Sequence, residues 1–408
     1  MSRQIAIIGG GASGLIAAIV AARCGSDVTI YEKNSRLGKK ILSTGNGRCN
    51  ISNENASKAN YHGSNVDFMD SVISKFWVKE TQDFFSELGL LLKTEDEGKI
   101  YPYSNQAAAV LDVLRFEVER LKIKVIYDFE AETIKKTKNG YSFTSYDGKG
   151  GFSERVIIST GGMAAPSTGS CGSGYKLCKM LGHSVTDVFP SLVQIKTKGG
   201  FAKSLKGIKT DALLSLGNIS FKGELLFTDY GISGPPVFSL SSYIRRKGDN
   251  TIRVNFMPEY TKEQIYNLLK LRCNRDVNLE NFFVGMLNKR LGMALLKECG
   301  ISPLSRPANS LKDYELDNLC NAIRNLSLTT DGTQSWNNAQ VTAGGVELYS
   351  VNPETLESLY NEGLYLCGEI LDIDGDCGGY NLQWAWSSGY IAGYNASESI
   401  KKEELTYE

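Results

Sequence analysis

Gly9, Gly11 and Gly14 stand in the spacing GxGxxG within the stretch IAIIGGGASG, near the start of the chain. In such a loop the first glycine permits a tight turn, and the second lets the backbone approach a pyrophosphate. The third lets a helix pack closely on a strand. The free N–H groups at the start of that helix then face the phosphates. The spacing therefore indicates dinucleotide chemistry.

The flanking segments predict the elements that must position this loop. QIAIIGG is a short apolar run typical of a buried parallel strand, and SGLIAAIVAARCG has apolar residues at helical spacing, with Gly25 near its end. DVTIYEK predicts a second strand, which ends at Glu32. A carboxylate at that point accepts hydrogen bonds from both ribose hydroxyls and disfavours a 2′-phosphate. NAD and FAD therefore remain as candidates.

The segment after Glu32 helps to decide between them. An NAD dehydrogenase usually returns to a helix here, whereas EKNSRLGKKILSTGNGRCNISN predicts an irregular, turn-rich loop. Its cations suit anionic groups, and its glycines allow close approach of backbone amides. The alternative is a mobile surface loop with solvated charges. The residues concerned are Lys33, Arg36, Lys39, Lys40, Gly45, Gly47 and Arg48.

Two distant segments add to this picture. ERVIISTGG predicts a strand that ends at Thr160, Gly161 and Gly162, after two strands joined by a turn at Asn139-Gly140. Near the C-terminus, EGLYLCGEILDIDGDCGGYNLQWAWSSG predicts a strand, the pair Gly368-Glu369, a glycine-rich loop and a helix from about Asn381. Glu369 is placed to hold a polyol, and the helix N-terminus can donate to a ring edge. A ligand that contacts both ends of the chain is long, which favours FAD.

Five segments resemble the BaiN-type bacterial flavoproteins, which are NAD(P)/FAD-dependent oxidoreductases of the glutathione-reductase-like superfamily. These are IIGGGASG, EKNSRLGKKILSTGNGRCNIS, IISTGGMAAPSTGSCGSGY, GELLFTDYGISGPPVFSLS and GLYLCGEILDIDGDCGGYNLQWAWSSG. The resemblance runs from Ile5 to about Asn395 and implies one tightly bound FAD.

The same resemblance implies a set of cofactor-binding residues. It assigns Gly9, Gly11, Ala12, Ser13 and Gly14 to the pyrophosphate, Glu32 and Lys33 to the ribose, and Lys40, Thr44, Gly45, Arg48, Cys49 and Asn50 to a loop near the flavin. It assigns Ala131 to the adenine side, Thr160, Gly161 and Gly162 to the returning strand end, Gly368 and Glu369 to the ribityl chain, and Gly379, Asn381 and Leu382 to the helix start beneath the pyrimidine ring.

The expected fold is α/β. A Rossmann-like, glutathione-reductase-type FAD-binding domain is expected from 1–190 and 341–408, with a β-rich insert at 191–257 and a helical insert at 258–340. The helical pattern extends to about Leu328. Within the β-rich insert, TDYGISGPPVF predicts a rigid turn that opens a helix. The family resemblance implies that this segment walls the substrate cavity, and the alternative is a turn that only joins two parts.

Composition narrows the range of partners. Lys plus Arg equals Asp plus Glu, so the formal net charge is zero, and nothing argues for a nucleic-acid or membrane surface. The nine cysteines contain no CxxC pair, and there are two histidines, His62 and His183. We therefore expect reduced thiols, no metal site, no transmembrane span and a cytoplasmic location.

A flavin carries out hydride transfer itself, so no nucleophile or paired carboxylate is required and no catalytic residue is assigned. The resemblance favours reduction of a conjugated carbon–carbon double bond, as in 3-oxo bile-acid intermediates, with NADH or NADPH as a transient donor. Two alternatives stay open: a peroxide-forming oxidase of a small amine, and a flavin-binding sensor without turnover. Arg48 could stabilise developing negative charge, and Tyr101, Tyr103 and Tyr380 are candidate proton donors.

Overall fold

The computed structural model describes residues 4–247 and 250–407, which fold into two compact units. Unit 1 comprises residues 1–190 and 340–408, and unit 2 comprises residues 191–339. In the part of the chain that the structure describes, no helix has the length and apolar character needed to cross a membrane.

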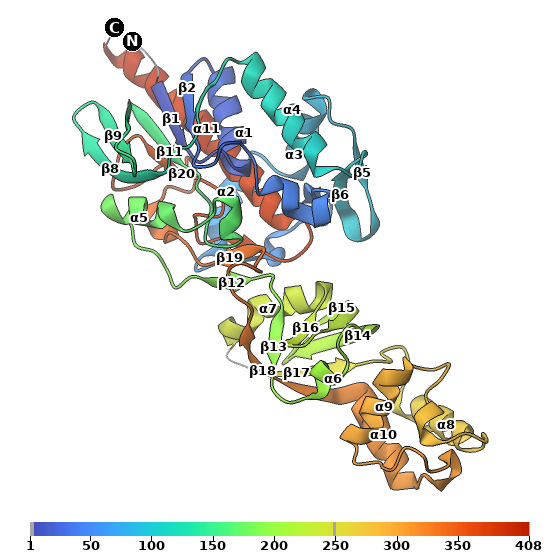
Figure 1. Cartoon of the computed structure of the whole chain (residues 1–408). Coiled ribbons are helices and arrows are strands. Elements are labelled where there is room, and N and C mark those ends of the chain that lie inside the picture. Colours follow the sequence, from blue (N-terminus) through green and yellow to red (C-terminus); the bar gives the residue numbers. More distant parts are fainter. Residues whose placement is uncertain (1–3, 248–249, 408) are drawn as a thin grey trace. The chain divides into compact units, whose positions relative to one another are not determined.

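A parallel sheet forms the centre of unit 1 (Figure 1). Its strand order is β20-β11-β1-β2-β7, and every neighbouring pair is parallel. The strands are β1 (Gln4–Ile8), β2 (Asp27–Tyr31), β7 (Lys124–Ile126), β11 (Arg155–Ile158) and β20 (Leu364–Leu366). Four residues of β1 and all four of β11 are buried, as expected of strands covered on both faces. This order confirms the Rossmann-like expectation for the first βαβ unit.

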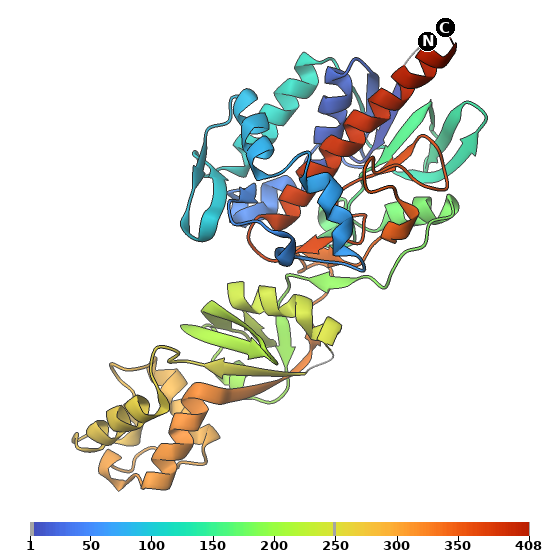
Figure 2. The ribbon, with the colours of Figure 1, turned by 180° about the vertical axis from the view of Figure 1, so that it is seen from behind.

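Helices α1 (Ala12–Arg23) and α11 (Tyr380–Tyr407) pack side by side in unit 1, and Figure 2 shows α11 as its longest helix. Glycines permit this packing. A Cβ on Gly389 would lie 2.4 Å from the Ser13 carbonyl oxygen, and one on Gly393 would lie 2.4 Å from the Ala17 carbonyl oxygen. The two helices therefore approach at backbone contact, which holds the C-terminal segment against the glycine-rich loop.

Smaller elements complete unit 1. A three-stranded antiparallel sheet has the order β10-β9-β8, and β8 and β9 meet at the expected Asn139-Gly140 turn. Two-stranded and three-stranded sheets have the orders β12-β19, β21-β4 and β3-β6-β5. The bounds are β3 (Ser52–Asn53), β4 (Tyr61–His62), β5 (Leu92–Thr94), β6 (Lys99–Pro102), β8 (Ala131–Thr137), β9 (Gly140–Ser145), β10 (Gly150–Ser153), β12 (Phe189–Ser191), β19 (Val341–Ala343), β21 (Asp374–Gly375), α2 (Asp70–Ile73), α3 (Val78–Glu87), α4 (Ala107–Arg120) and α5 (Ser173–Met180).

Unit 2 is built on a closed barrel with the strand order β13-β16-β15-β14-β17-β18. The strands are β13 (Ile195–Thr197), β14 (Lys209–Leu216), β15 (Ile219–Phe227), β16 (Gly231–Ser233), β17 (Thr251–Asn255) and β18 (Leu326–Thr333). Its helices are α6 (Phe201–Ser204), α7 (Pro235–Lys247), α8 (Lys262–Cys273), α9 (Lys289–Glu298) and α10 (Asp313–Asn325). The predicted turn at Gly234-Pro235-Pro236 does open a helix, α7, since proline is favoured at a first helical turn.

One expectation for this unit is corrected. The helical pattern was expected to reach Leu328, but α10 ends at Asn325 and residues from Leu326 form β18. Leu326, Leu328 and Thr330 are buried and alternate with exposed residues, which is the period of a strand. β18 pairs with β17 and β13, so the chain returns to the barrel after its helices. The division of the insert into two parts at 257/258 stays a prediction.

The substitution Gly393→Ala tests the contact of α11 with α1. The added Cβ would collide with backbone that cannot turn aside, and this overpacking outweighs the higher helix propensity of alanine. We expect the free energy of unfolding to fall by about 1–3 kcal/mol in urea denaturation.

Gly150→Ala in β10 is the matched control in unit 1, because a Cβ there has no described atom within 4 Å. Equal stability of the Gly393→Ala variant and the wild type would contradict the close packing.

Candidate cofactor site in unit 1

The glycine-rich loop follows β1 and opens α1. Gly9 has φ +107°, and its N–H donates to the Tyr31 carbonyl at 2.9 Å, which fixes the turn. A Cβ on Gly14 would lie 2.0 Å from the Gly9 carbonyl oxygen, so only glycine permits this close packing. A Cβ on Gly11 would have no described atom within 4 Å. The loop therefore leaves open space above Gly11, where the sequence predicts a pyrophosphate.

Glu32 follows β2 and is buried, with 6% of its surface exposed. Its Oε2 accepts from the Gly10 N–H at 2.7 Å, and its Oε1 accepts from the backbone and side-chain nitrogens of Asn34, both at 2.7 Å. These bonds hold the carboxylate beside the glycine-rich loop. Each ionised carboxylate oxygen can accept more than one hydrogen bond, so acceptor capacity for ribose hydroxyls remains.

The residues expected on the adenine side of the cofactor lie near Glu32. The Phe129 N–H donates to the Glu32 carbonyl at 2.9 Å, and Ala131 begins β8. Lys33 Nζ lies 2.7 Å from Glu130 Oε1 and 3.1 Å from Cys171 Sγ. The structure thus brings Lys33 and Ala131 to one side of the expected ribose position.

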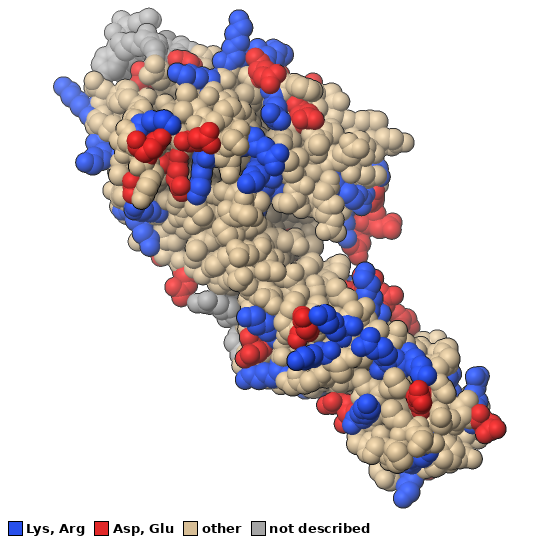
Figure 3. Space-filling view, viewed as in Figure 1, with Lys and Arg blue, Asp and Glu red and all other residues tan. Residues whose placement is uncertain are grey.

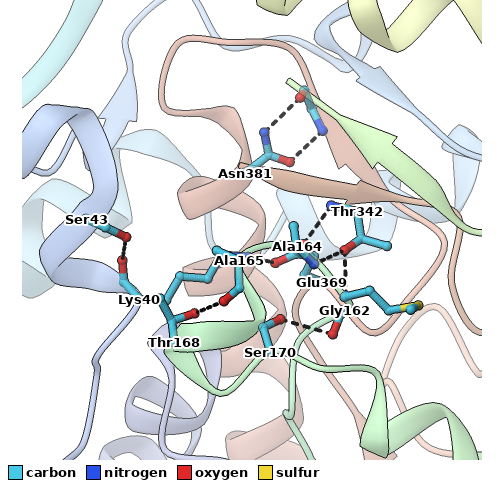
Figure 4. Close-up of polar contacts among 12 residues, drawn as sticks. Lys40, Ser43, Gly162, Ala164, Ala165, Thr168, Ser170, Thr342, Glu369 and Asn381 are labelled. Carbon is cyan, nitrogen blue, oxygen red and sulfur yellow. Dashed lines mark hydrogen bonds and ion pairs between the residues drawn. The ribbon is translucent and has the colours of Figure 1, made fainter. Parts of the chain in front are cut away.

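An ion pair joins the two ends of the chain. Lys40 Nζ lies 2.7 Å from Glu369 Oε2, although the residues are 329 positions apart. The other carboxylate oxygen of Glu369 accepts from the Thr342 N–H at 2.7 Å. Figure 4 shows these residues around the segment that follows β11. The convergence of distant segments expected from the sequence is therefore present within unit 1.

Thr342 also organises the segment after β11. Its Oγ1 accepts from the N–H groups of Met163 and Ala164 at 2.7 and 3.0 Å (Figure 4). Ser170 Oγ donates to the Gly162 carbonyl at 3.0 Å, and a Cβ on Gly162 would lie 2.3 Å from Thr342 Oγ1. Sequence reasoning found Thr160, Gly161 and Gly162 but not Thr342 or Ser170, because lone hydroxyl residues give no pattern.

The start of α11 is held from several directions. Asn381 receives a hydrogen bond from the Gly375 N–H and donates to the Gly375 carbonyl, both at 2.8 Å (Figure 4). Trp384 Nε1 donates to the Gly368 carbonyl at 3.2 Å, and the Gly368 N–H donates to Ser388 Oγ at 2.9 Å. Asn381 therefore holds the loop before α11 through these two hydrogen bonds. Gly379 and Leu382 lie at the start of the helix, as expected.

The loop of residues 41–50 is irregular, as the sequence indicates. A short 3₁₀ segment covers Ile41–Gly47, and left-handed backbone occurs at Gly45, Asn46 and Cys49. The Cys49 N–H donates to the Thr44 carbonyl at 3.0 Å, and a Cβ on Gly45 would lie 2.7 Å from the Asn50 nitrogen. The turn places Thr44, Gly45, Arg48, Cys49 and Asn50 in one compact bend.

Arg48 is held by three partners that the sequence did not identify. Its Nη2 donates to Glu95 Oε1 at 2.5 Å and to Asn105 Oδ1 at 2.6 Å, and its guanidinium carbon lies 4.0 Å from the centre of the Tyr101 ring. The hydrogen bond from Arg48 lowers the pKa of Glu95 to about 2. Glu95 therefore stays ionised at neutral pH and fixes the orientation of the guanidinium.

Buried polar atoms without a hydrogen-bond partner indicate whether these residues suit a bound cofactor. Among the described residues, Asn50 Oδ1, Thr160 Oγ1 and the Tyr175 hydroxyl are buried without a hydrogen-bond partner. A buried polar group without a partner is costly and normally marks an absent water, ion or ligand. Asn50 and Thr160 belong to the expected site, while burial and the nearby charge of Glu369 raise the pKa of Tyr175. Other such atoms, Gln194 Oε1 and Arg324 Nε among them, lie outside the site. Together with the open space above Gly11, the unpartnered atoms of Asn50 and Thr160 suit a polar, elongated ligand.

The cysteines do not support thiol chemistry. Burial raises the pKa of Cys49 to about 12 and also raises that of Cys377. Both thiols are therefore protonated at neutral pH. His62 lies 2.9 Å from Asp376, and buried His183 lies 2.8 Å from Ser350 and from Ser358. No metal-holding cluster of His, Cys, Asp and Glu occurs among the described residues.

Comparison with known proteins decides the family. The model described as the HI0933-like protein Rossmann domain matches residues 3–395. The chain belongs to this family. It is 42% identical, over 97% of its length and 99% of the other chain, to the 3-dehydro-bile acid delta(4,6)-reductase of Clostridium scindens. It is 30% identical, over 96% and 98% of the two chains, to the ribosomal RNA dihydrouridine synthase of Haemophilus influenzae.

A solved structure agrees on the fold alone. The 3-ketosteroid delta1-dehydrogenase of Sterolibacterium denitrificans aligns with a TM-score of 0.50 at 11% identity, covering 98% of this chain and all of that one. The expected BaiN-type resemblance is confirmed, and the chain is an FAD-dependent oxidoreductase. The roles of the individual site residues stay predictions.

Two substitutions at the loop separate binding from folding. In Gly11→Ala the new methyl group enters the open space without touching described atoms, so we expect normal stability but at least about tenfold weaker FAD binding. In Gly14→Ala the Cβ meets the Gly9 carbonyl oxygen, so we expect destabilisation. Flavin fluorescence titration and thermal unfolding measure the two effects. Undiminished FAD affinity in Gly11→Ala would refute the pyrophosphate assignment.

The substitution Glu32→Ala removes the expected ribose acceptor. We expect about 10- to 100-fold weaker FAD binding, since each hydrogen bond to a charged group contributes about 1.5–3 kcal/mol. Glu117→Ala is a matched control, because Glu117 is also 6% exposed but bonds to Arg23 and Arg120 instead. Its FAD affinity should match that of the wild type. Equal losses of affinity in both variants would point to unfolding rather than a ribose contact.

Proposed function

We propose that this flavoprotein reduces a carbon–carbon double bond conjugated to a carbonyl group of an oxo, steroid- or bile-acid-like substrate, with NADH or NADPH as a transient electron donor. The observation that carries the proposal is the 42% identity, over nearly the whole of both chains, to a reductase of this kind.

FAD, when bound, supplies hydride transfer. Gly11 and the start of α1 would hold its pyrophosphate, Glu32 and Lys33 its ribose, and Glu369 its ribityl chain. The ion pair with Lys40 orients Glu369, and Thr342 fixes its second oxygen. These contacts would hold the cofactor but would not select the substrate.

Arg48 and Tyr101 are the groups best suited to act on the substrate. Arg48 Nε and Nη2 are engaged with Asn105 and Glu95, so the guanidinium is oriented in advance. Its side chain is 34% exposed and can donate to a carbonyl oxygen that gains negative charge. Burial raises the pKa of Tyr101, so its phenol stays protonated over the neutral range and can supply a proton.

A second candidate function is the reduction of a uracil ring in RNA. The double bond of uracil is also conjugated to a ring carbonyl, and the Haemophilus influenzae relative is named a ribosomal RNA dihydrouridine synthase. The observation that favours this candidate is the charge of unit 2, whose sequence holds 20 Lys and Arg against 13 Asp and Glu. Both candidates require the same chemistry in unit 1.

Anaerobic titration tests the reaction type. We expect NADH or NADPH to bleach the yellow protein and a conjugated enone to restore its colour. Arg48→Met should bleach normally but transfer to the enone about 100-fold more slowly, because an oriented charge donor has been lost. Arg120→Met, which removes an arginine from the ion pair with Glu117 on α4, is the control. Bleaching by a small amine, with peroxide on admission of air, would instead establish the oxidase alternative.

A further inference from the structure

The zero net charge of the chain is the sum of two opposite values. Unit 2 has 20 basic and 13 acidic residues in its sequence, a net charge of +7. The remaining residues, which make up unit 1, have 25 basic and 32 acidic residues, a net charge of −7. The expectation of no nucleic-acid partner was based on the net charge of the whole chain, in which the opposite charges of the two units cancel. A polyanion would be attracted by unit 2 and repelled by unit 1.

Part of the positive charge is concentrated on one side of the barrel. Lys and Arg side chains predominate around α6 and β14 in Figure 3. We name as the basic face Lys198, Lys203, Lys206, Lys209 and Arg290, all of which are exposed. They come from the end of β13, from α6, from the loop after it, from β14 and from the start of α9.

Backbone contacts hold this group together. Arg290 Nη2 donates to the Ser204 carbonyl at 2.8 Å and Nη1 to the Lys206 carbonyl at 3.5 Å, so α9 is tied to the α6 loop. The Gly207 N–H donates to the Phe227 carbonyl at 2.9 Å, which ties the same loop to β15. The lysines therefore extend from a fixed backbone.

Three carboxylates partly offset the charge. Asp229 lies 2.8 Å from Lys206, and Glu224 lies 2.8 Å from Lys209. Exposed Asp211 lies on the same side of β14 as Lys209, opposite Glu224 on β15. Five basic and three acidic side chains leave a net charge of +2. The side chains of Lys206 and Lys209 are 64% and 60% exposed, so both remain accessible to a ligand despite their ion pairs. Exposed ion pairs of this kind contribute little to stability. A phosphate group can therefore readily replace the carboxylate as the partner of the lysine.

The chemistry of the face suits phosphates that repeat along a chain. Its cations are all exposed, and four of the five are lysines, whose long side chains reach into solvent. Several exposed cations gain affinity for a nucleic-acid backbone by releasing its condensed counterions. Such contacts position a strand without reading its sequence, which leaves recognition of the base to another site.

We propose that the basic face of unit 2 is a docking surface for RNA, the substrate of the second candidate function. The inference rests on the second candidate function. The positive charge of unit 2 attracts the RNA over long distances, and the FAD site in unit 1 carries out the reduction.

Binding is measured by fluorescence anisotropy with the oxidised holoprotein and no electron donor, so that no turnover occurs. The probe is a labelled, uridine-rich RNA of about 30 nucleotides, titrated over a range of salt concentrations. The variant Lys198→Gln/Lys203→Gln/Lys209→Gln loses three charges of the face but keeps the backbone contacts of Arg290. The control Lys135→Gln/Lys136→Gln/Lys138→Gln loses three exposed charges on β8 and the following turn of unit 1.

We expect the wild type to bind RNA with strong salt dependence, and the unit 2 variant to bind at least about tenfold more weakly with a shallower salt slope. The control should stay within about twofold of the wild type. No RNA binding, equal losses in both variants, or tighter binding to phosphatidylglycerol vesicles than to RNA would overturn the proposal. The anaerobic enone titration is independent of this surface, so its failure would count against the reaction and not against RNA docking.

Discussion

The contact of α11 with α1 is the constraint on which the site depends. Gly389 and Gly393 let α11 reach the backbone of Ser13 and Ala17, so the helix that ends the chain lies on the helix that begins it. This contact carries Gly368, Glu369 and the start of α11 to the glycine-rich loop. The Lys40–Glu369 ion pair forms across the same junction. Loss of the helix contact would separate the glycine-rich loop from Gly368 and Glu369.

Much of unit 1 could be predicted because its signals are local. GxGxxG, an apolar strand and Glu32 lie within one βαβ unit, and Gly9 and Gly14 have steric reasons that the structure shows, such as the 2.0 Å approach of a Gly14 Cβ to the Gly9 carbonyl oxygen. Thr342 and Glu95 were missed since their roles depend on partners far away in sequence. The start of β18, as far as Leu328, was assigned to a helix because Leu326 continues the apolar spacing of Leu319 and Ile323, and only pairing with β17 and β13 reveals the strand.

The polar groups of the site fall into two sets, according to whether they have a hydrogen-bond partner among the described residues. Glu32, Thr342 and Asn381 have protein partners that fix their positions. Asn50 Oδ1, Thr160 Oγ1 and the Tyr175 hydroxyl lack such partners among the described residues. Because buried polar atoms normally find partners, this second group is the more informative about what binds. Arg48 combines both properties, as it is oriented by Glu95 and Asn105 yet partly exposed.

The opposite charges of the two units explain how one reaction could serve different substrates. In the proposed reaction, a conjugated double bond is reduced by FAD that has first taken a hydride from NADH or NADPH, and unit 1 would supply the oriented cation and the proton donor. Selection then depends on what reaches that site. A steroid-like molecule carries little charge and gains nothing from a net +7 unit, whereas RNA gains long-range attraction that salt weakens. The excess of lysine and arginine in unit 2 is therefore a feature that a small apolar substrate does not require and a polyanion does.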